Sequence, residues 1–154
     1  MLKSLIYGIF FVLIDQLSKW FIIEKIDLDN IGIYDVYSPF LTLKMGWNTG
    51  INFGLFSGSH DYMRWILVLI SIAICLLLLF WARNLKGNVV PILIGLVIGG
   101  AIGNVIDRIR FGAVVDFLNM SCCGIQNPYI FNLADIFVFT GLILLVVFLE
   151  RFQK

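Results

Sequence analysis

The chain has 154 residues, of which 60% are hydrophobic and only 14% are charged, and its mean hydropathy is +0.98. A soluble domain is roughly half apolar, so this composition indicates an integral membrane protein and leaves little chain for a separate soluble domain. The formal net charge of +1 indicates neither a nucleic-acid-binding surface nor a polybasic lipid-binding tail.

The apolar residues gather in four segments that are long enough to cross a bilayer, which takes about 20 residues. Two longer segments, residues 24–61 and 107–133, are expected to form loops on the outer side of the membrane. The sequence therefore predicts a single integral-membrane domain over residues 1–154, of the membrane all-α class. We place its four transmembrane helices at residues 4–23, 62–81, 88–106 and 134–149.

An even number of spans puts both termini on one side, together with the short turn "ARNLKGN". Each side carries five basic residues, but those on the side of the termini fall in very short segments. Because the positive-inside rule gives most weight to short loops near span ends, we expect both termini in the cytoplasm. The basic residues are Lys3, Arg83, Lys86, Arg151 and Lys154 on that side, and Lys25, Lys44, Arg64, Arg108 and Arg110 on the other.

Two charged residues, Asp15 and Lys19, interrupt the first apolar segment. No small-residue cleavage pattern follows it, so we expect a retained span and not a secretory signal. A spacing of four residues places both side chains on one helix face, and ionisable groups within a span usually face the bundle interior. We favour a structural ion pair near the outer end of this span over direct catalysis.

The first outer loop contains the alternating stretch "FLTLKMGW", bounded by Pro39 and by Gly50 and Gly54. Alternation between turn residues predicts short strands. We therefore expect this loop to form a small β-rich platform at the outer membrane surface. Asn48, beside the turn, is either a cap or a ligand for a substrate backbone, and the spacing leaves both open.

Three glycines, Gly95, Gly99 and Gly103, recur at intervals of four in the third span. Small residues at this spacing let helix backbones approach closely, so we expect them to serve helix packing.

Polar residues close the third span: Asn104, Asp107 and Arg108. Arg108 can hold a carboxylate by two hydrogen bonds. Capping, pairing and anchoring at the interface explain these residues as well as a direct role in a site does. Asn132, just before the last span, is likewise either a helix cap or a ligand.

Asp116 and Asp135 differ from these because neither has an obvious cation nearby in the sequence. Asp116 lies in the apolar run "AVVDFL" and Asp135 in the first turn of the last span. If the intervening loop returns, both lie near one interface, where two carboxylates share a proton. Such a pair permits general acid-base chemistry at neutral pH. The alternative is structural, since a helix N-terminus favours an acidic residue and Asp116 can be a turn residue.

The remaining candidates for special chemistry are few. Cys75 lies inside the second span and is expected to be an apolar filler. Cys122 and Cys123 are adjacent, and because a bridge between neighbours is strained we expect no structural disulfide there. His60 has no partners at metal-ligand spacing, so we expect no metal site.

Five motifs occur in order along the spans: "DQLSK", "NTGINFG", "GGAIGNVIDR", "GAVVDF" and "FNLAD". With this set over essentially its whole length, the chain resembles the lipoprotein signal peptidases, or signal peptidase II. The resemblance implies a bacterial cytoplasmic-membrane enzyme with its active site near the outer leaflet. Such an enzyme cleaves prolipoproteins on the amino side of a diacylglyceryl cysteine, without metal or other cofactor, among membrane lipids. It also implies inhibition by peptide antibiotics of the globomycin type.

The resemblance further implies that Asp116 and Asp135 form the catalytic dyad. Two positions depart from the family pattern: Ser18 stands where Thr is common, and Asn52 where Ala is usual, which affects the expected packing beside Asn48. The positions implied in substrate binding or in shaping the site are Asp15, Lys19, Asn48, Gly50, Asn104, Asp107, Arg108, Asn132 and Ala134.

Two other functions remain open on the residues alone. An ion-coupled transporter could use the intramembrane Asp, Lys and Arg residues, although transporter sites tend to lie at the bilayer midplane, often between repeated halves. A scaffold whose polar residues only specify helix packing would tolerate Asn in place of either aspartate.

Overall fold

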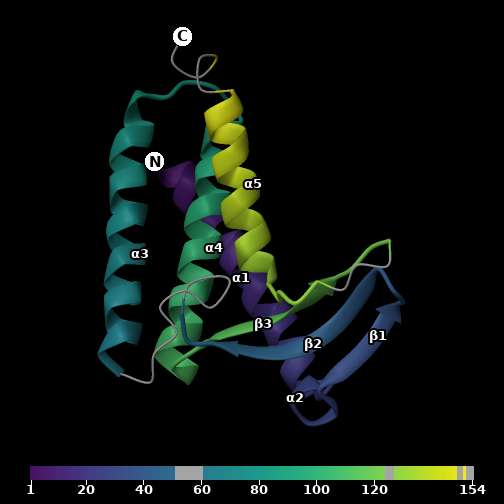
Figure 1. Ribbon diagram of the computed structural model, residues 1–154. Coiled ribbons are helices and arrows are strands. Elements are labelled where there is room, and N and C mark those ends of the chain that lie inside the picture. The colour runs from purple at the N-terminus through teal and green to yellow at the C-terminus, as the bar shows by residue number, and fades with distance from the viewer. Residues whose placement is uncertain (51–60, 124–126, 149–150, 152–154) are drawn as a thin grey trace.

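The computed structural model describes residues 1–50, 61–123, 127–148 and 151. A bundle of long helices carries a small sheet at one end, and the N-terminus and the end of α5 lie at the other (Figure 1). The long helices are α1 (Leu2–Glu24), α3 (Asp61–Trp81), α4 (Val90–Phe111) and α5 (Leu133–Val147), with a short α2 (Leu28–Ile31) and a 3-10 turn (Ala82–Asn84). The strands are β1 (Ile33–Tyr37), β2 (Leu41–Asn48) and β3 (Val114–Met120).

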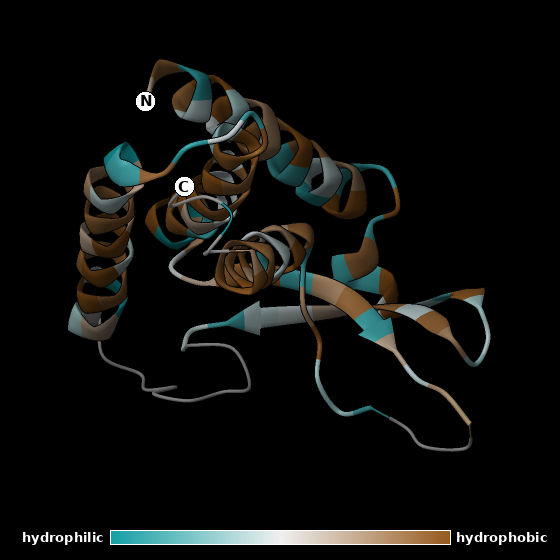
Figure 2. Ribbon diagram, turned by 90° about the horizontal axis from the view of Figure 1, so that it is seen from above, coloured by the Kyte–Doolittle hydropathy of each residue, from teal (hydrophilic) through white to brown (hydrophobic). Residues whose placement is uncertain are grey.

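The helices confirm the predicted membrane protein. Three of them, α1, α3 extended to Asn84, and α4, are long and apolar enough to cross a bilayer, and α5 is a shorter apolar helix. Its 15 residues extend about 22 Å at a rise of about 1.5 Å per residue. Most of the length of the helices is coloured as hydrophobic in Figure 2, as expected where lipid and neighbouring helices share their surface.

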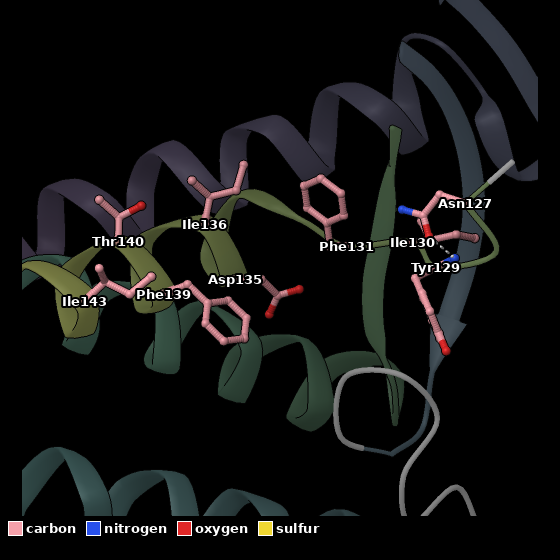
Figure 3. A pocket seen from close by; sticks show the side chains of 9 residues that line it. All are labelled: Asn127, Tyr129, Ile130, Phe131, Asp135, Ile136, Phe139, Thr140 and Ile143. Atoms are coloured by element: carbon pink, nitrogen blue, oxygen red, sulfur yellow. Dashed lines mark hydrogen bonds between the residues drawn. The ribbon is translucent and has the colours of Figure 1, made fainter. Parts of the chain in front are cut away.

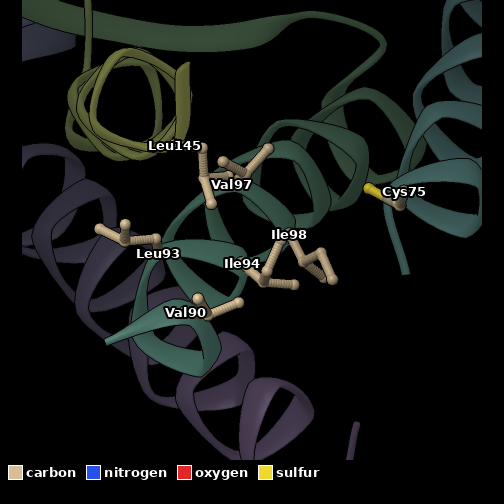
Figure 4. Close-up of a cluster of buried hydrophobic side chains, with 7 residues drawn as sticks. All are labelled: Cys75, Val90, Leu93, Ile94, Val97, Ile98 and Leu145. Carbon is tan, nitrogen blue, oxygen red and sulfur yellow. The ribbon is translucent and has the colours of Figure 1, made fainter. Parts of the chain in front are cut away.

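Helix α4 is the centre of the bundle and packs against α1, α3 and α5. In its most apolar stretch 61% of the residues are buried, compared with 17% in α3, whose surface is left mainly to lipid. Since lipid tails are as apolar as the core, close fit drives this packing. The buried cluster in Figure 4 comes mostly from α4 and consists of Cys75, Val90, Leu93, Ile94, Val97, Ile98 and Leu145.

The α4 glycines make the close packing possible, as their spacing predicts. A Cβ at Gly99 would lie 2.6 Å from the Cβ of Phe11 on α1. On another side of α4, a Cβ at Gly100 would meet the carbonyl oxygen of Ala134 on α5. A Cβ at Gly103 would overlap the carboxylate of Asp15. These glycines therefore allow α1 and α5 to pack closely against α4 and leave room for the Asp15 side chain.

The sheet has the order β1-β2-β3, and both strand pairs are antiparallel. Strands β1 and β2 confirm the platform expected from the first outer loop. A third strand that the sequence did not predict, β3, comes from the second loop and completes the sheet. The apolar run around Asp116 pairs with β2, with Gly46 opposite Asp116 and Trp47 opposite Val115.

Helix α4 continues past the third span predicted at 88–106, to Phe111, and Gly112, with a φ of 81°, is its glycine C-cap. Asp107 and Arg108 therefore lie in the last turns of this helix. One expectation near the second loop is wrong. Cys122 and Cys123 do form a disulfide, in a turn after β3 where Cys123 adopts a positive φ.

Two alanine substitutions at the α1–α4 contact test this packing. At Gly99 an added Cβ would also lie 2.8 Å from the Gly8 carbonyl oxygen, whereas at Gly8 the nearest atom, in Ile98, would be 3.6 Å away. We expect Gly99→Ala to lower the free energy of unfolding by about 1–3 kcal/mol, since α1 must move. Gly8→Ala should leave it unchanged or raise it. Thermal unfolding in detergent measures both, and equal melting temperatures for the two variants would contradict this account.

Candidate active site

Asp116 and Asp135 meet where the sheet joins the bundle. Asp116 lies in the middle of β3, and Asp135 lies in the first turn of α5. The chain between them returns along β3, where the N–H of Phe131 donates to the carbonyl oxygen of Leu118 at 3.0 Å. The loop between the two aspartates therefore returns to the same interface, as the predicted pair requires. Both carboxylates are buried, with exposed fractions of 3% and 5%.

Asn132 joins the two carboxylates. It is the N-cap of α5, where its Oδ1 accepts from the N–H of Asp135 at 2.9 Å. Its own N–H donates to Asp135 Oδ2 at 3.3 Å, which completes a capping box. Because the Asp135 N–H can only donate, it must face the Asn132 Oδ1, and the Asn132 Nδ2 is the group that faces Asp116. It donates to Asp116 Oδ1 at 2.6 Å.

Two further amides bind the remaining carboxylate oxygens. Asn48, at the end of β2, donates from Nδ2 to Asp116 Oδ2 at 3.0 Å. Asn104, on α4, donates from Nδ2 to Asp135 Oδ1 at 3.0 Å. Each of the four carboxylate oxygens thus accepts one N–H, and no cation donates to any of them within the described part of the chain.

The surroundings of Asp116 alter its titration. Burial raises its pKa from 3.8 to about 7, and the neighbouring carboxylate of Asp135 adds to the rise. The hydrogen bonds from Asn48 and Asn132 act in the opposite direction. Asp116 can therefore both hold and release a proton near neutral pH.

Beside these carboxylates lies a buried ionic cluster centred on Lys19. The Lys19 Nζ lies 2.8 Å from Asp15 Oδ2, which confirms the pair predicted from their spacing. It also lies 2.7 Å from Asp107 Oδ2 on α4. The same ammonium donates to Asn104 Oδ1 at 3.2 Å, so it orients the Asn104 amide with Nδ2 toward Asp135.

The two carboxylates of this cluster also hold backbone. Asp15 Oδ1 accepts the N–H of Ala134 on α5 at 3.0 Å. Asp107 Oδ2 accepts the N–H of Val115 on β3 at 3.1 Å. No group of three His, Cys, Asp or Glu side chains that could hold a metal ion occurs among the described residues. The positive charge at the centre of the cluster is that of Lys19.

Two polar residues make contacts that the sequence did not predict. Arg108 forms no ion pair with a carboxylate of the described residues; its Nη2 donates to the carbonyl oxygen of Gly50 at 2.6 Å. Its Nε is buried and has no hydrogen-bond partner in the described ranges. Gln16, which sequence reasoning passed over, donates from Nε2 to Asp107 Oδ1 at 2.8 Å. The feature of the sequence that could have identified Gln16 is its polar amide within an apolar span. Asn52 lies outside the described residues.

Two grooves reach Asp135 from different sides of α5. The α5 groove, of about 440 Å³, is lined by Tyr129, Ile130, Ile136, Phe139, Thr140 and Ile143 among others (Figure 3). The α3–α5 groove, of about 470 Å³, is lined by Leu67, Ser71, Ala101, Arg108, Phe139 and Leu142 among others. Because Asp135 lines both, a ligand in either groove reaches this carboxylate.

The fold and the site are those of a multi-pass membrane enzyme. Two solved structures described as bacterial membrane enzymes resemble the chain, each at 28% identity. One has a TM-score of 0.76 and covers 98% of this chain and 89% of its own. The other has a TM-score of 0.73 and covers 97% of this chain and 93% of its own.

The family model of signal peptidase (SPase) II matches residues 7–151. The chain belongs to this family of aspartic peptidases. A lipoprotein signal peptidase of Rhodopseudomonas palustris is 37% identical, over 87% of this chain and 83% of the relative. One of Nitrobacter hamburgensis is 38% identical, over 86% of this chain and 82% of the relative. These matches support a peptidase and not the ion-coupled transporter.

Replacing Lys19 tests the ionic cluster. We expect Lys19→Met to destabilise the protein by about 3–5 kcal/mol, because it leaves the buried carboxylates of Asp15 and Asp107 without their cation. Lys3→Met is the control, since Lys3 lies on the same helix and is exposed. Thermal unfolding in detergent compares them, and a Lys19→Met melting temperature equal to that of the control would refute the central role of this cation.

Proposed function

We propose that the chain is a prolipoprotein signal peptidase of the bacterial cytoplasmic membrane, working as a single integral-membrane domain. Its substrate is a diacylglyceryl-modified prolipoprotein, cleaved on the amino side of the lipidated cysteine. The observation that carries this proposal is the pair of buried carboxylates, Asp116 and Asp135, each held by neutral N–H donors. The names of the relatives, lipoprotein signal peptidases, support the substrate.

The two carboxylates have different roles in the proposed reaction. Asp135 accepts two N–H groups at the positive end of α5, so we assign it the negative charge and the role of base. Asp116, with a pKa of about 7, carries the proton. Asp135 takes a proton from water as the water oxygen attacks the scissile carbonyl carbon, and Asp116 protonates the carbonyl oxygen. When the tetrahedral gem-diol intermediate collapses, Asp135 gives its proton to the leaving cysteine nitrogen and Asp116 takes back the proton of one hydroxyl group, which restores both starting states.

The remaining candidate residues hold this geometry. Lys19 orients Asn104, and Asn132 orients both aspartates. Arg108 fixes Gly50 beside Asn48, whose Oδ1 accepts the Gly50 N–H at 3.0 Å. Fixed positions of this kind supply much of the catalytic advantage of an enzyme. The residues that we assign to substrate binding or to shaping the site are Asp15, Lys19, Asn48, Gly50, Asn104, Asp107, Arg108, Asn132 and Ala134.

We place both termini in the cytoplasm and the sheet at the outer leaflet. The N-terminus and the last turn of α5 lie at the end of the bundle away from the sheet (Figure 1). Short basic segments containing Lys3, Arg83 and Lys86 belong to that end, which supports a cytoplasmic location. The carboxylates then lie near the outer interface, where a lipidated cysteine would stand with its acyl chains in the bilayer.

Cleavage of a purified diacylglyceryl prolipoprotein tests the dyad. We expect Asp116→Asn and Asp135→Asn to lose at least about 100-fold in kcat, the contribution of a general acid or base. In Asp116→Asn the new amide N–H must face the Nδ2 of Asn48 or of Asn132, so that two hydrogen-bond donors oppose each other. Asp116→Ala is a second variant that avoids this contact. Asp35→Asn on β1, exposed on the same sheet, should keep full activity.

Thermal unfolding confirms that each variant is folded. A folded Asp116 or Asp135 variant that cleaves at a rate comparable to the wild type would rule out that residue as part of the catalytic pair.

The pH dependence follows from the raised pKa of Asp116. Because the folded pKa of about 7 exceeds the ordinary 3.8, the folded protein binds this proton more tightly than the unfolded chain does. The linked stability is complete below about pH 3.8 and is lost as pH rises through about 7. As acid, Asp116 must be protonated, so kcat/KM should fall about tenfold per unit above that pH. A flat profile between pH 6 and 9 would contradict the assigned role.

A further inference from the structure

The lipid-modified substrate of the proposed reaction has two apolar parts, and the protein has two apolar grooves. In a prolipoprotein the signal helix and the diacylglyceryl group both end at the lipidated cysteine, next to the scissile bond. In the protein the α5 groove and the α3–α5 groove adjoin each other at Asp135 and Phe139, which line both of them. The junction of the two grooves therefore corresponds to the junction of the two apolar parts.

The α3–α5 groove has the features of a helix-docking site. Helix α3 packs on α4 and makes at most marginal contact with α5. Small side chains face the groove from two helices, Ser71 on α3 and Ala101 on α4, and small residues let a helix backbone approach closely. On α4 the groove runs from Val97 to Arg108, about 16 Å or three helical turns.

The end of the α3–α5 groove nearest the carboxylates is polar. Asn104 and Arg108 line it together with Asp135. The Nε of Arg108 is buried there without a hydrogen-bond partner in the part of the chain that the structure describes. The last turn of a helix presents carbonyl oxygens that need donors, whereas an acyl chain has no polar group to offer. A polypeptide therefore suits this groove better than a lipid does.

The α5 groove has a different lining. Figure 3 shows Ile136, Phe139, Thr140 and Ile143 along α5, leading to the carboxylate of Asp135. From Asp135 to Ile143 the groove follows α5 for about 12 Å. Its walls, like most of those of the α3–α5 groove, are branched and aromatic side chains that accommodate flexible chains, but none of its described lining residues is an arginine. Asn127 and Tyr129 lie at its mouth, where ester groups of a glycerolipid would be.

We propose that the α5 groove holds the acyl chains of the diacylglyceryl group and that the α3–α5 groove holds the signal helix. This assignment rests on the proposed peptidase function and adds to it a separate binding site for each part of the substrate. The scissile peptide then crosses the N-terminal end of α5 between the grooves, in front of Asp135. Acyl length and signal-helix shape become independent determinants of cleavage.

A bulky residue in each groove separates the two sites. The variants are Thr140→Trp in the α5 groove and Ser71→Trp in the α3–α5 groove. Their controls, Val146→Trp on α5 and Leu69→Trp on α3, are at exposed positions that do not line either groove. Each purified protein is assayed in detergent with two synthetic prolipoproteins that share one signal sequence and carry either dipalmitoyl or dibutyryl glyceryl groups.

We expect Thr140→Trp to lower kcat/KM for the dipalmitoyl substrate about tenfold, as overpacking does, and to leave the dibutyryl substrate within about twofold. Ser71→Trp should lower kcat/KM for both substrates by the same factor. Both controls should match the wild type, and thermal unfolding verifies folding.

Other patterns overturn the assignment. An acyl-length effect at Ser71 and none at Thr140 would reverse the two occupants. Wild-type kinetics in both groove variants would show that neither groove holds substrate. If the folded wild type cleaves neither substrate, the proposed peptidase function itself fails and takes this assignment with it; cleavage with the wrong pattern removes only the groove assignment.

Discussion

The buried ammonium of Lys19 is the interaction on which the site depends. It neutralises one carboxylate from its own helix and one from α4. Those carboxylates in turn bind the backbone at the start of α5 and in β3, the two elements that carry Asp135 and Asp116. A single cation thus connects α1, α4, α5 and β3 by short polar contacts. Removing it would leave two charges buried with nothing to balance them, which is among the most costly changes a protein interior can undergo.

Glycine makes this cluster sterically possible. The Asp15 carboxylate occupies the space where a side chain at Gly103 would lie, and Gly100 lets α4 approach the backbone of Ala134. That approach brings the Ala134 N–H within 3.0 Å of Asp15. The close packing of the helices and the geometry of the site therefore depend on the same glycines. The same stripe of small residues that joins the helices also sets the position of the polar cluster.

Local patterns predicted much of this arrangement. Hydropathy located the four helices, the spacing of Asp15 and Lys19 predicted their ion pair, and the glycine interval predicted close packing. The third strand was missed because an apolar run around Asp116 fits a loop edge as well as a sheet interior. The Lys19 contact with Asp107 spans 88 positions, and no local period encodes such a distance. The chemistry of Arg108 allowed a carboxylate partner among other roles, and the fold places the Gly50 carbonyl oxygen within its reach.

The four buried aspartates divide by the groups that neutralise them. Asp15 and Asp107 both contact the ammonium of Lys19, and each also accepts a backbone N–H from another element. Asp116 and Asp135 accept hydrogen bonds only from neutral N–H groups in the described part of the chain. A neutral donor orients a carboxylate but does not compel it to stay ionised, and burial then raises the pKa of Asp116 to about 7. The protein thus uses one pair of aspartates to join its elements around a cation and holds the other pair with neutral donors, where Asp116 can exchange a proton near neutral pH.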